Sequence, residues 1–443
     1  MSLEKQKIIT QLKPHSRKII TQAEKIKEKV DNWLIIDQAP KRQLIEWITI
    51  DWKYSKDLDD WIWAEKTKNW YSVFISISDV SEYITPNTLL DLQAKRKTTS
   101  IYLNTHVYHM FPQILSTDIF SLNWEKNTLT QTLRVDLNNN FKIINSQHFE
   151  TTFYNQKRYS YEEFNEDFQN PESVNYKLIN LLHLISQWLK HNRINSWWNA
   201  HFREYVTLKL DKECNKNKQL NIGQDIISEL ALLRNIESAK LAYKEKIAII
   251  YRWYRPELEN KITWNLPSNK WFFNFKPTYH AWLKQNFYTY DTSPIRRYSD
   301  LITQRQIKAK LRKQEGIYNL SQIRKIAYDL NTSIDKILNL QRQHNYQVNI
   351  KRSERLLKKL EQDKFKNIWT IAEKTFFYLT KYLIEYKPYL FNYWPIKEEY
   401  IYRIKNNYLN TKNIAIIRSA PNNIIELEDI KALFLQNSFE ELY

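Results

Sequence analysis

Glycine is almost absent from the sequence, with two residues in a chain of 443. Glycine is the usual residue where a backbone takes positive φ angles or approaches a phosphate group closely. Glycine-rich phosphate loops of the Walker and dinucleotide-binding types are therefore excluded. We accordingly expect no small-molecule organic cofactor.

Cysteine, long apolar runs and a secretory signal are also missing. The single cysteine, Cys214, excludes an intrachain disulfide framework and a thiolate zinc site. No segment approaches the roughly 18 apolar residues of a membrane span, and the N-terminus has no apolar signal core. These absences predict an intracellular protein without a membrane partner. Abundant Lys, Asn, Ile, Tyr and Phe are typical of AT-rich coding sequence, as in a plastid, another organelle or an endosymbiont, although the 16 Trp residues do not fit that bias.

Acidic residues are fewer than basic residues in this chain. The chain has 67 Lys and Arg against 49 Asp and Glu, a formal net charge of +18. Such an excess favours a polyanionic partner, either nucleic acid or a membrane surface. A basic protein with no such partner is the alternative, and charge alone does not decide between them. The apolar fraction of 42% is sufficient for a packed core.

The hydrophobic pattern changes along the chain from strand-like to helical. Residues 47–154 predict mainly strands, and residues from about 171 onward predict mainly helices. The expected helices are 20–33, 38–47, 87–94, 174–191, 222–243, 301–312 and 320–360, the last interrupted near Asn345. The expected strands include 71–84, a hairpin over 130–149 turning at Asn-Asn-Asn, and two short strands over 414–430. We predict three parts: a basic extension (1–40), a catalytic domain (41–345) and a helical C-terminal region (346–443), in which an S1-like tail is either degenerate or missing.

A cluster of four aspartates stands out in this basic chain. Asp51, Asp57, Asp59 and Asp60 lie in the segment TIDWKYSKDLDDW, between an apolar strand and the run Trp61-Ile62-Trp63. Carboxylates packed so closely repel one another unless a cation neutralises them. Oxygen ligands suit Mg²⁺ or Mn²⁺, and two such ions would clamp a scissile phosphate. A solvated acidic turn is the other interpretation of the cluster.

Several blocks in order follow the signature of a known family. They are Thr49-Ile50-Asp51 with Asp57-Leu58-Asp59-Asp60, Ile77-Ser78-Asp79-Val80-Ser81-Glu82-Tyr83, Ser100-Ile101-Tyr102-Leu103, Met110-Phe111-Pro112, residues 115–122, and Thr292-Ser293-Pro294-Ile295-Arg296-Arg297-Tyr298-Ser299-Asp300-Leu301. Together they resemble the ribonuclease II family, the exoribonucleases with an RNB domain, whose pattern begins T-I-D-x(5)-D-x-D-D. The resemblance covers residues 41–312. It implies an α+β fold in which a sheet-rich N-terminal half is packed by helices of the C-terminal half.

The resemblance also implies roles for individual residues. Asp51, Asp57 and Asp60 would be ligands of Mg²⁺, or of Mn²⁺, and Asp59 would be a catalytic acidic residue acting on the metal or its water. Arg296 would contact the scissile phosphate, because a guanidinium fork matches phosphate oxygens and stays charged. The further RNA-binding residues would be Tyr102, by stacking on a terminal base, Glu229 in the RNA channel, and Arg297. For Asp79 we favour a structural role.

The sequence departs from the family at several histidines. Ser76, Tyr254, Tyr290 and Gln304 stand where the family has histidine. The N-terminal residues are too few for the two cold-shock-type barrels that the family usually carries, and the tail lacks the glycines of an S1 barrel. Loss of those barrels would weaken RNA binding.

Three functions are compatible with these observations. The first is a hydrolytic 3′→5′ exoribonuclease that degrades single-stranded RNA to nucleoside 5′-monophosphates with Mg²⁺. The second is a non-catalytic relative that binds RNA as an accessory subunit, which the altered histidines favour and the retained aspartates oppose. A structural protein without an RNA role would require the ordered blocks to be chance. The sequence does not identify protein partners.

Overall fold

The computed structural model describes residues 12–32, 42–195 except 104, 105 and 125, 222–254, 271–371 except 281, 282 and 284, and part of 376–391. The chain divides into two compact units, Met1–Leu338 and Asn339–Tyr443. The strands expected over 414–430 lie outside the described residues, and the predicted domain boundaries stay predictions. Among the residues described, no helix is both long and apolar enough to cross a bilayer.

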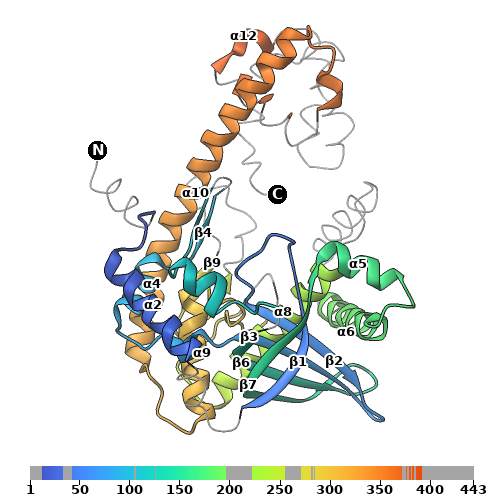
Figure 1. The fold of residues 1–443 in the computed structure, drawn as a ribbon, viewed down its shortest axis with the longest axis vertical. Coiled ribbons are helices and arrows are strands. Elements are labelled where there is room, and N and C mark those ends of the chain that lie inside the picture. Colours follow the sequence, from blue (N-terminus) through green and yellow to red (C-terminus); the bar gives the residue numbers. More distant parts are fainter. Residues whose placement is uncertain are drawn as a thin grey trace. The chain divides into compact units, whose positions relative to one another are not determined.

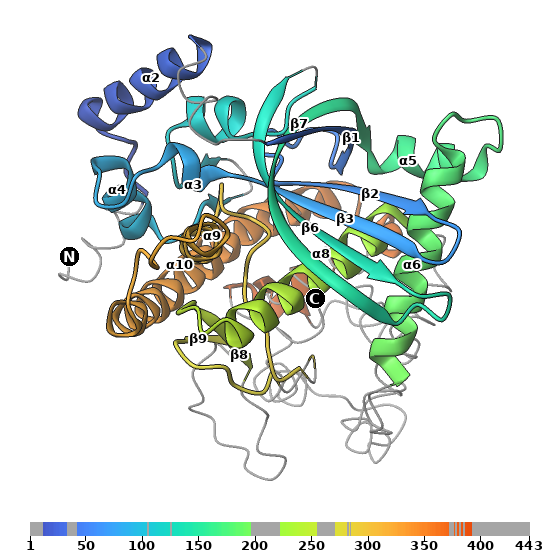
Figure 2. The ribbon, with the colours of Figure 1, turned by 90° about the horizontal axis from the view of Figure 1, so that it is seen from below.

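A closed five-stranded barrel forms the first half of the larger unit (Figures 1 and 2). Its strands, in spatial order, are β1 (Gln43–Asp51), β2 (Asp60–Lys66), β3 (Tyr71–Ser78), β6 (Asn127–Leu137) and β7 (Ile143–Ser160). Neighbours are antiparallel except for β1 and β7, whose parallel pairing closes the barrel. The helix expected over 38–47 is wrong for residues 43–47, because this segment pairs with residues 151–155 of β7. Strand pairing here overrides local helix propensity.

The hairpin between β6 and β7 confirms the turn expected at the asparagine run. The positive φ of 54° falls on Phe141, however, and not on an asparagine. The Asn138 side chain accepts hydrogen bonds from the backbone N–H groups of Asn140 (2.9 Å) and Lys142 (3.0 Å). The Phe141 ring stacks on Tyr71 and Trp188, at centroid distances of 4.8 and 5.3 Å. Aromatic packing therefore holds a bulky residue in a backbone conformation that usually selects glycine or asparagine.

Helices α5 (Tyr161–Gln169), α6 (Tyr176–Asn195) and α8 (Ile222–Lys244) pack against one face of the sheet (Figure 2). Their buried Ile and Leu side chains join Ile48, Ile50 and Ile62 of the strands in one core. Gly223 permits this close approach, since a Cβ there would lie 2.9 Å from Cδ1 of Tyr161. The predicted helices over 174–191 and 222–243 are confirmed.

A second core lies among helices that come before β1, between β3 and β6, and after β9 in sequence. Its elements include α2 (Arg17–Asp31), α3 (Val80–Tyr83), α4 (Leu89–Lys97), the π-helix η2 (Leu115–Ile119), α9 (Tyr298–Leu311) and the first part of α10 (Leu320–Gln362). The short hairpins β4 (Ile101–Tyr102) with β5 (Val107–Tyr108), and β8 (Tyr251–Tyr254) with β9 (Trp271–Asn274), complete this unit. The break expected near Asn345 is wrong: α10 is continuous, and its sequence has no proline or glycine to interrupt it. The smaller unit contains η3 (Ile368–Thr370) and α12 (Pro388–Phe391).

Positive φ angles fall entirely on non-glycine residues in the described part of the chain. Three of them, Lys246, Lys313 and Lys364, end helices with the same hydrogen-bond pattern. At Lys364 (φ 55°), after α10, Phe365 N donates to Leu360 O at 2.7 Å. Lys246 (φ 54°) follows α8, where Ile247 N donates to Ala242 O at 2.8 Å, and Lys313 (φ 57°) follows α9, where Gln314 N donates to Ala309 O at 2.8 Å. This is the hydrogen-bond pattern in which glycine is the preferred C′ residue. The shortage of glycine thus leaves these three helix ends strained.

We expect Lys246→Gly to stabilise the protein by roughly 0.5–1 kcal/mol, because relief of left-handed strain exceeds the added flexibility of the unfolded chain. Lys244→Gly, at the last residue of α8, is the matched control and should destabilise by up to about 1 kcal/mol. Urea denaturation of the three proteins measures both changes. Equal destabilisation by the two substitutions would contradict this account.

Candidate active site

The four aspartates lie where β1 ends and β2 begins. Asp51 is the last residue of β1 and Asp60 the first of β2, with Asp57 and Asp59 in the connection. Leu58 and Trp61, between and after them, are buried. The Trp61 ring contacts Trp47 edge-on at 4.1 Å and stacks on Phe153 at 4.7 Å. These apolar anchors fix the connection, so the acidic side chains cannot move away together as a free loop could.

Each of three carboxylates has a different partner. Asp51 Oδ1 accepts hydrogen bonds from Trp52 N (2.6 Å) and Ser55 Oγ (2.8 Å). The Tyr102 hydroxyl donates to Asp57 Oδ2. Asp59 Oδ1 accepts from Ile295 N at 2.9 Å, and its Oδ2 lies 3.6 Å from Arg296 Nε. The fold thus brings the aspartates, Tyr102 and Arg296 together from three separate segments.

Burial sets the electrostatics of this site. It raises the pKa of Asp59 well above its ordinary value, against the opposing effect of Arg296. Burial, with the nearby charge of Asp51, raises the pKa of Asp60 to about 7. Burial also raises the pKa of Asp51, although its hydrogen bonds from Ser55 and Trp52 oppose the shift. Ionised carboxylates are costly here without a compensating cation, and an all-carboxylate set fits Mg²⁺ or Mn²⁺.

Arg296 and its neighbour Arg297 face different surroundings. The Arg296 backbone carbonyl accepts hydrogen bonds from Thr99 Oγ1 (2.7 Å) and Ser100 N (2.9 Å), while its side chain remains 43% exposed beside Asp59. Arg297 instead pairs with Asp300 at 2.6 Å and lies over the Tyr290 ring at 4.1 Å. Arg296 Nη2 also donates to Ser293 Oγ at 2.9 Å. The Arg296 side chain is thus held within the protein but partly exposed to a ligand, whereas Arg297 is more deeply buried.

Tyr102 and Glu229, the other predicted RNA contacts, also differ. Tyr102 is 42% exposed and lies beside Asp57. Glu229 is buried and forms an ion pair with Arg193, whose Nε lies 3.1 Å from Oε2. Tyr102 therefore lies at the site with the aspartates, whereas Glu229 is engaged by Arg193.

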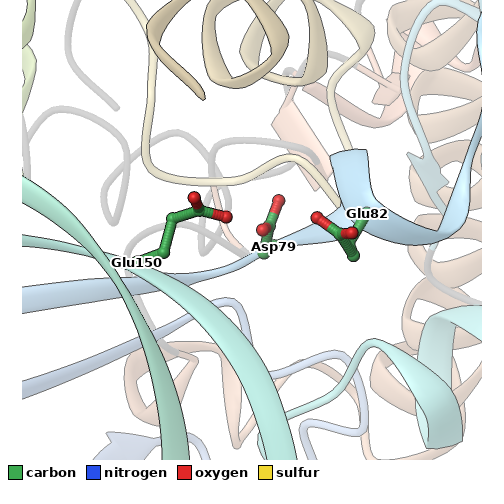
Figure 3. Close-up of side chains that lie close together, drawn as sticks. All are labelled: Asp79, Glu82 and Glu150. Carbon is green, nitrogen blue, oxygen red and sulfur yellow. The ribbon is translucent and has the colours of Figure 1, made fainter. Parts of the chain in front are cut away.

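A second acidic group lies outside the sequence prediction. Oxygen atoms of Asp79, Glu82 and Glu150 lie within 4.8 Å of one another, and the three side chains point toward a common centre (Figure 3). No such group of three forms among Asp51, Asp57, Asp59 and Asp60, all of which the structure describes. Proximity alone would make Asp79, Glu82 and Glu150 a candidate metal site.

Protein cations already occupy that position. Arg42 Nη2 lies 2.9 Å from Asp79, 3.0 Å from Glu82 and 2.9 Å from Glu150. Lys308 pairs with Asp79 and Glu82, and Arg312 pairs with Glu82 and Glu150. Three carboxylates thus meet three cations, and we call this set the Arg42 ion network. It joins the start of β1 and the middle of β7 to α3 and α9, in line with the structural role expected for Asp79.

A buried arginine positions the segment that precedes Arg296. Arg234 of α8 is fully buried and donates from Nη1 to the carbonyls of Ile75 (2.8 Å) and Gln131 (2.9 Å). Its Nη2 pairs with Asp291 at 3.0 Å. Sequence reasoning missed this residue and the Arg42 ion network, because their partners lie far apart in the chain and share no local spacing.

Two of the positions altered from histidine are buried, and a third packs between arginines. Ser76 is buried and hydrogen-bonds Thr132, and Gln304 is buried and donates to Ser78 O at 2.7 Å. Tyr290 lies between the guanidinium groups of Arg252 (4.6 Å) and Arg297 (4.1 Å). The replacements are therefore accommodated by packing at these sites.

Comparison with known proteins identifies the fold and the family. The model of the RNB domain matches residues 42–270 and 254–313, and the chain belongs to this family. Ribonuclease R of Buchnera aphidicola is 27% identical over 317 residues, which cover 58% of this chain and 44% of that protein. The chain therefore spans less than half of that relative's length.

Solved structures agree on the fold. Mycoplasma genitalium RNase R in complex with ribose-methylated single-stranded RNA has a TM-score of 0.63 at 21% identity, covering 76% of this chain and 62% of that one. Yeast Ssd1, a pseudonuclease, has a TM-score of 0.57 at 16% identity, covering 70% of this chain and 45% of that one. The predicted α+β RNB fold is confirmed.

We expect Arg42→Met to destabilise the protein by about 3–5 kcal/mol, because it leaves buried carboxylates without their shared cation. Lys27→Met, which breaks ion pairs between partly exposed groups, is the control and should cost about 1 kcal/mol or less. Urea denaturation measures both.

The effect of Arg42→Met should also depend on pH. The cations hold the pKa of Asp79 below its ordinary value, so this stabilisation is fully present above that ordinary value and is lost as pH falls. The difference between parent and variant should therefore shrink below about pH 4. A pH-independent difference would contradict the ionic origin.

Proposed function

We propose that the protein is a hydrolytic 3′→5′ exoribonuclease that degrades single-stranded RNA to nucleoside 5′-monophosphates. The observation that favours it most is the approach of Arg296 to Asp59 from a segment far away in sequence. An exposed guanidinium beside a carboxylate cluster offers the two charges that phosphodiester hydrolysis needs. Membership of the RNB family and similarity to an RNase R bound to single-stranded RNA support the substrate class.

Asp51, Asp57 and Asp60 would hold Mg²⁺ or Mn²⁺. When bound, the cation would supply Lewis-acid stabilisation of the phosphate and a water of lowered pKa. Asp59, fixed by Ile295 N, would orient that water from the buried side of the site. Arg296 would hold the phosphate oxygens and stabilise the charge that grows on them as water attacks and the 3′-oxygen leaves.

Tyr102 would stack on a base near the RNA terminus and limit how far the product can be shortened. Its half-exposed ring and its hydrogen bond to Asp57 support this role, because the ring would then offer a stacking surface beside the proposed metal ligands. RNA contacts by Glu229 and Arg297 stay predictions, in which each would act together with its ion-pair partner. The location inside a cell and a plastid or endosymbiont source also stay predictions.

A non-catalytic RNA-binding role is the alternative. The divergent carboxylates of the acidic cluster favour it, since they do not form a group around one point, and so does the fold similarity to the pseudonuclease Ssd1. The hydrogen bonds that hold Asp51 and Asp57 apart come from neutral donors. Such bonds contribute only about 0.5–1.5 kcal/mol each, so we favour the enzyme.

Asp59→Asn should abolish hydrolysis while RNA affinity stays near that of the parent. The amide keeps the oxygen that accepts from Ile295 N but loses the negative charge. Cleavage of a 5′-labelled single-stranded RNA with Mg²⁺ measures activity, and a filter-binding assay measures affinity. Asp118→Asn, at a surface ion pair, is the control. Cleavage by Asp59→Asn at the parent rate, or by the parent in excess chelator, would overturn the proposed mechanism.

Arg296→Ala should lower kcat by roughly 10²–10³-fold, more than it weakens RNA binding, because its contact strengthens in the transition state. Single-turnover cleavage and equilibrium binding separate the two effects. Arg17→Ala, at an 82% exposed side chain, is the matched control. Equal losses in rate and affinity would assign Arg296 to substrate positioning alone.

A further inference from the structure

The loop between the first two aspartates has an unusual composition. Residues 52–56 read Trp-Lys-Tyr-Ser-Lys, at the five positions that the acidic signature leaves unspecified. Two aromatic rings and two ammonium groups thus stand between Asp51 and Asp57. We call these five residues the aromatic loop.

The aromatic loop is held in one conformation by its polar residues. Ser55 N donates to Trp52 O at 2.9 Å, and Ser55 Oγ donates to Asp51 at 2.8 Å. Arg158 Nη2 of β7 lies 3.4, 3.3 and 2.5 Å from the carbonyl oxygens of Trp52, Lys53 and Ser55. The backbone of the loop is therefore fixed to the barrel beside the site.

The large side chains of the loop nevertheless point into solvent. Tyr54 is 84% exposed and Trp52 is 52% exposed. Trp52 rests edge-on against Tyr161 at 5.1 Å, and Lys53 and Lys56 are both exposed. A fixed backbone that displays aromatic rings has already lost the flexibility that binding would remove. Such a surface suits a planar partner.

Charge explains why lysines accompany the rings. Four carboxylates in the neighbouring cluster would repel the phosphates of an approaching RNA. Lys53 and Lys56 lie on either side of Tyr54 in sequence and offset that repulsion where the strand would pass. Stacking of bases on aromatic rings, with cations tracking the phosphates, is how proteins bind single strands without reading their sequence.

We propose that the aromatic loop is a base-stacking surface for single-stranded RNA, in which Tyr54 and Trp52 contact bases and Lys53 and Lys56 contact phosphates next to the acidic cluster. This inference rests on the proposed function, because it takes RNA as the ligand. It adds binding residues that lie outside the family signature.

Binding of a fluorescent single-stranded RNA tests the proposal, with Tyr54→Ser, Tyr54→Phe and Tyr328→Ser compared with the parent protein. Tyr54→Ser should weaken binding by roughly 5- to 20-fold, as expected for loss of one stacked base, and Tyr54→Phe should retain parent affinity. Tyr328 of α10 is 73% exposed, so Tyr328→Ser is the matched control and should bind like the parent. The same variants should also be tested on RNAs that each lack one base. At one position, loss of the base should weaken binding by the parent protein, and Tyr54→Ser should weaken binding to that RNA no further.

The lysines have a separate readout. Lys53→Ala should reduce the dependence of log affinity on log salt concentration by about 0.7, as expected for one phosphate contact on a single strand, while Tyr54→Ser should leave that slope unchanged. RNA binding by the parent that is insensitive to Tyr54→Ser, or equally sensitive to Tyr328→Ser, would overturn the aromatic loop but not the proposed function. Absence of RNA binding by the parent would overturn both.

Discussion

The ion pair between Arg234 and Asp291 is the contact on which the site geometry most depends. Burial lowers the pKa of Arg234 and raises the pKa of Asp291. Both shifts mean that the desolvation free energy of each charged group exceeds the favourable free energy of the ion pair. The pair is thus a weak source of stability but a strong constraint on position, since separating the two would leave a buried charge uncompensated. It fixes α8, β3, β6 and the segment entering Arg296 at one point.

The Arg42 ion network supplies the same kind of constraint on the other side of α9. It ties the C-terminal part of that helix, through Lys308 and Arg312, to Glu150 of the barrel and Glu82 of α3. At the N-terminal side, Thr99 and Ser100 hold the Arg296 carbonyl. Arg296 therefore meets Asp59 because α9 is attached to the barrel at its C-terminal end, while the segment between α4 and β4 holds the residue before its N-terminal end. The Arg42 ion network, whose carboxylates resemble a metal site, thus helps to orient Arg296, the residue proposed to bind phosphate.

Local sequence patterns predicted much of this fold and failed where pairing with a distant strand determines the secondary structure. The helices at 174–191 and 222–243 have clear apolar periodicity and were predictable, as was the hairpin at the asparagine run. Residues 43–47 form a strand only because β7 offers a parallel partner, and no local pattern reports that. For the site, the family signature predicted that the aspartates and Arg296 lie close together. It could not show that Asp51 and Asp57 turn toward Ser55 and Tyr102, because those contacts depend on side-chain packing.

Whether the acidic cluster can serve a metal depends on the energy needed to redirect these carboxylates. Asp51 is held by the Ser55 hydroxyl and the Trp52 backbone N–H, and Asp57 by the Tyr102 phenol. Water or a metal-bound water can replace these donors at small cost in free energy. Asp59 is different, since Arg296 and a buried backbone N–H both hold it in place. Burial has already raised the pKa of Asp51, Asp59 and Asp60, so a divalent cation would recover the free energy that their ionisation now costs. These energies support the proposal that Asp51, Asp57 and Asp60 would converge on a cation while Asp59 keeps its position.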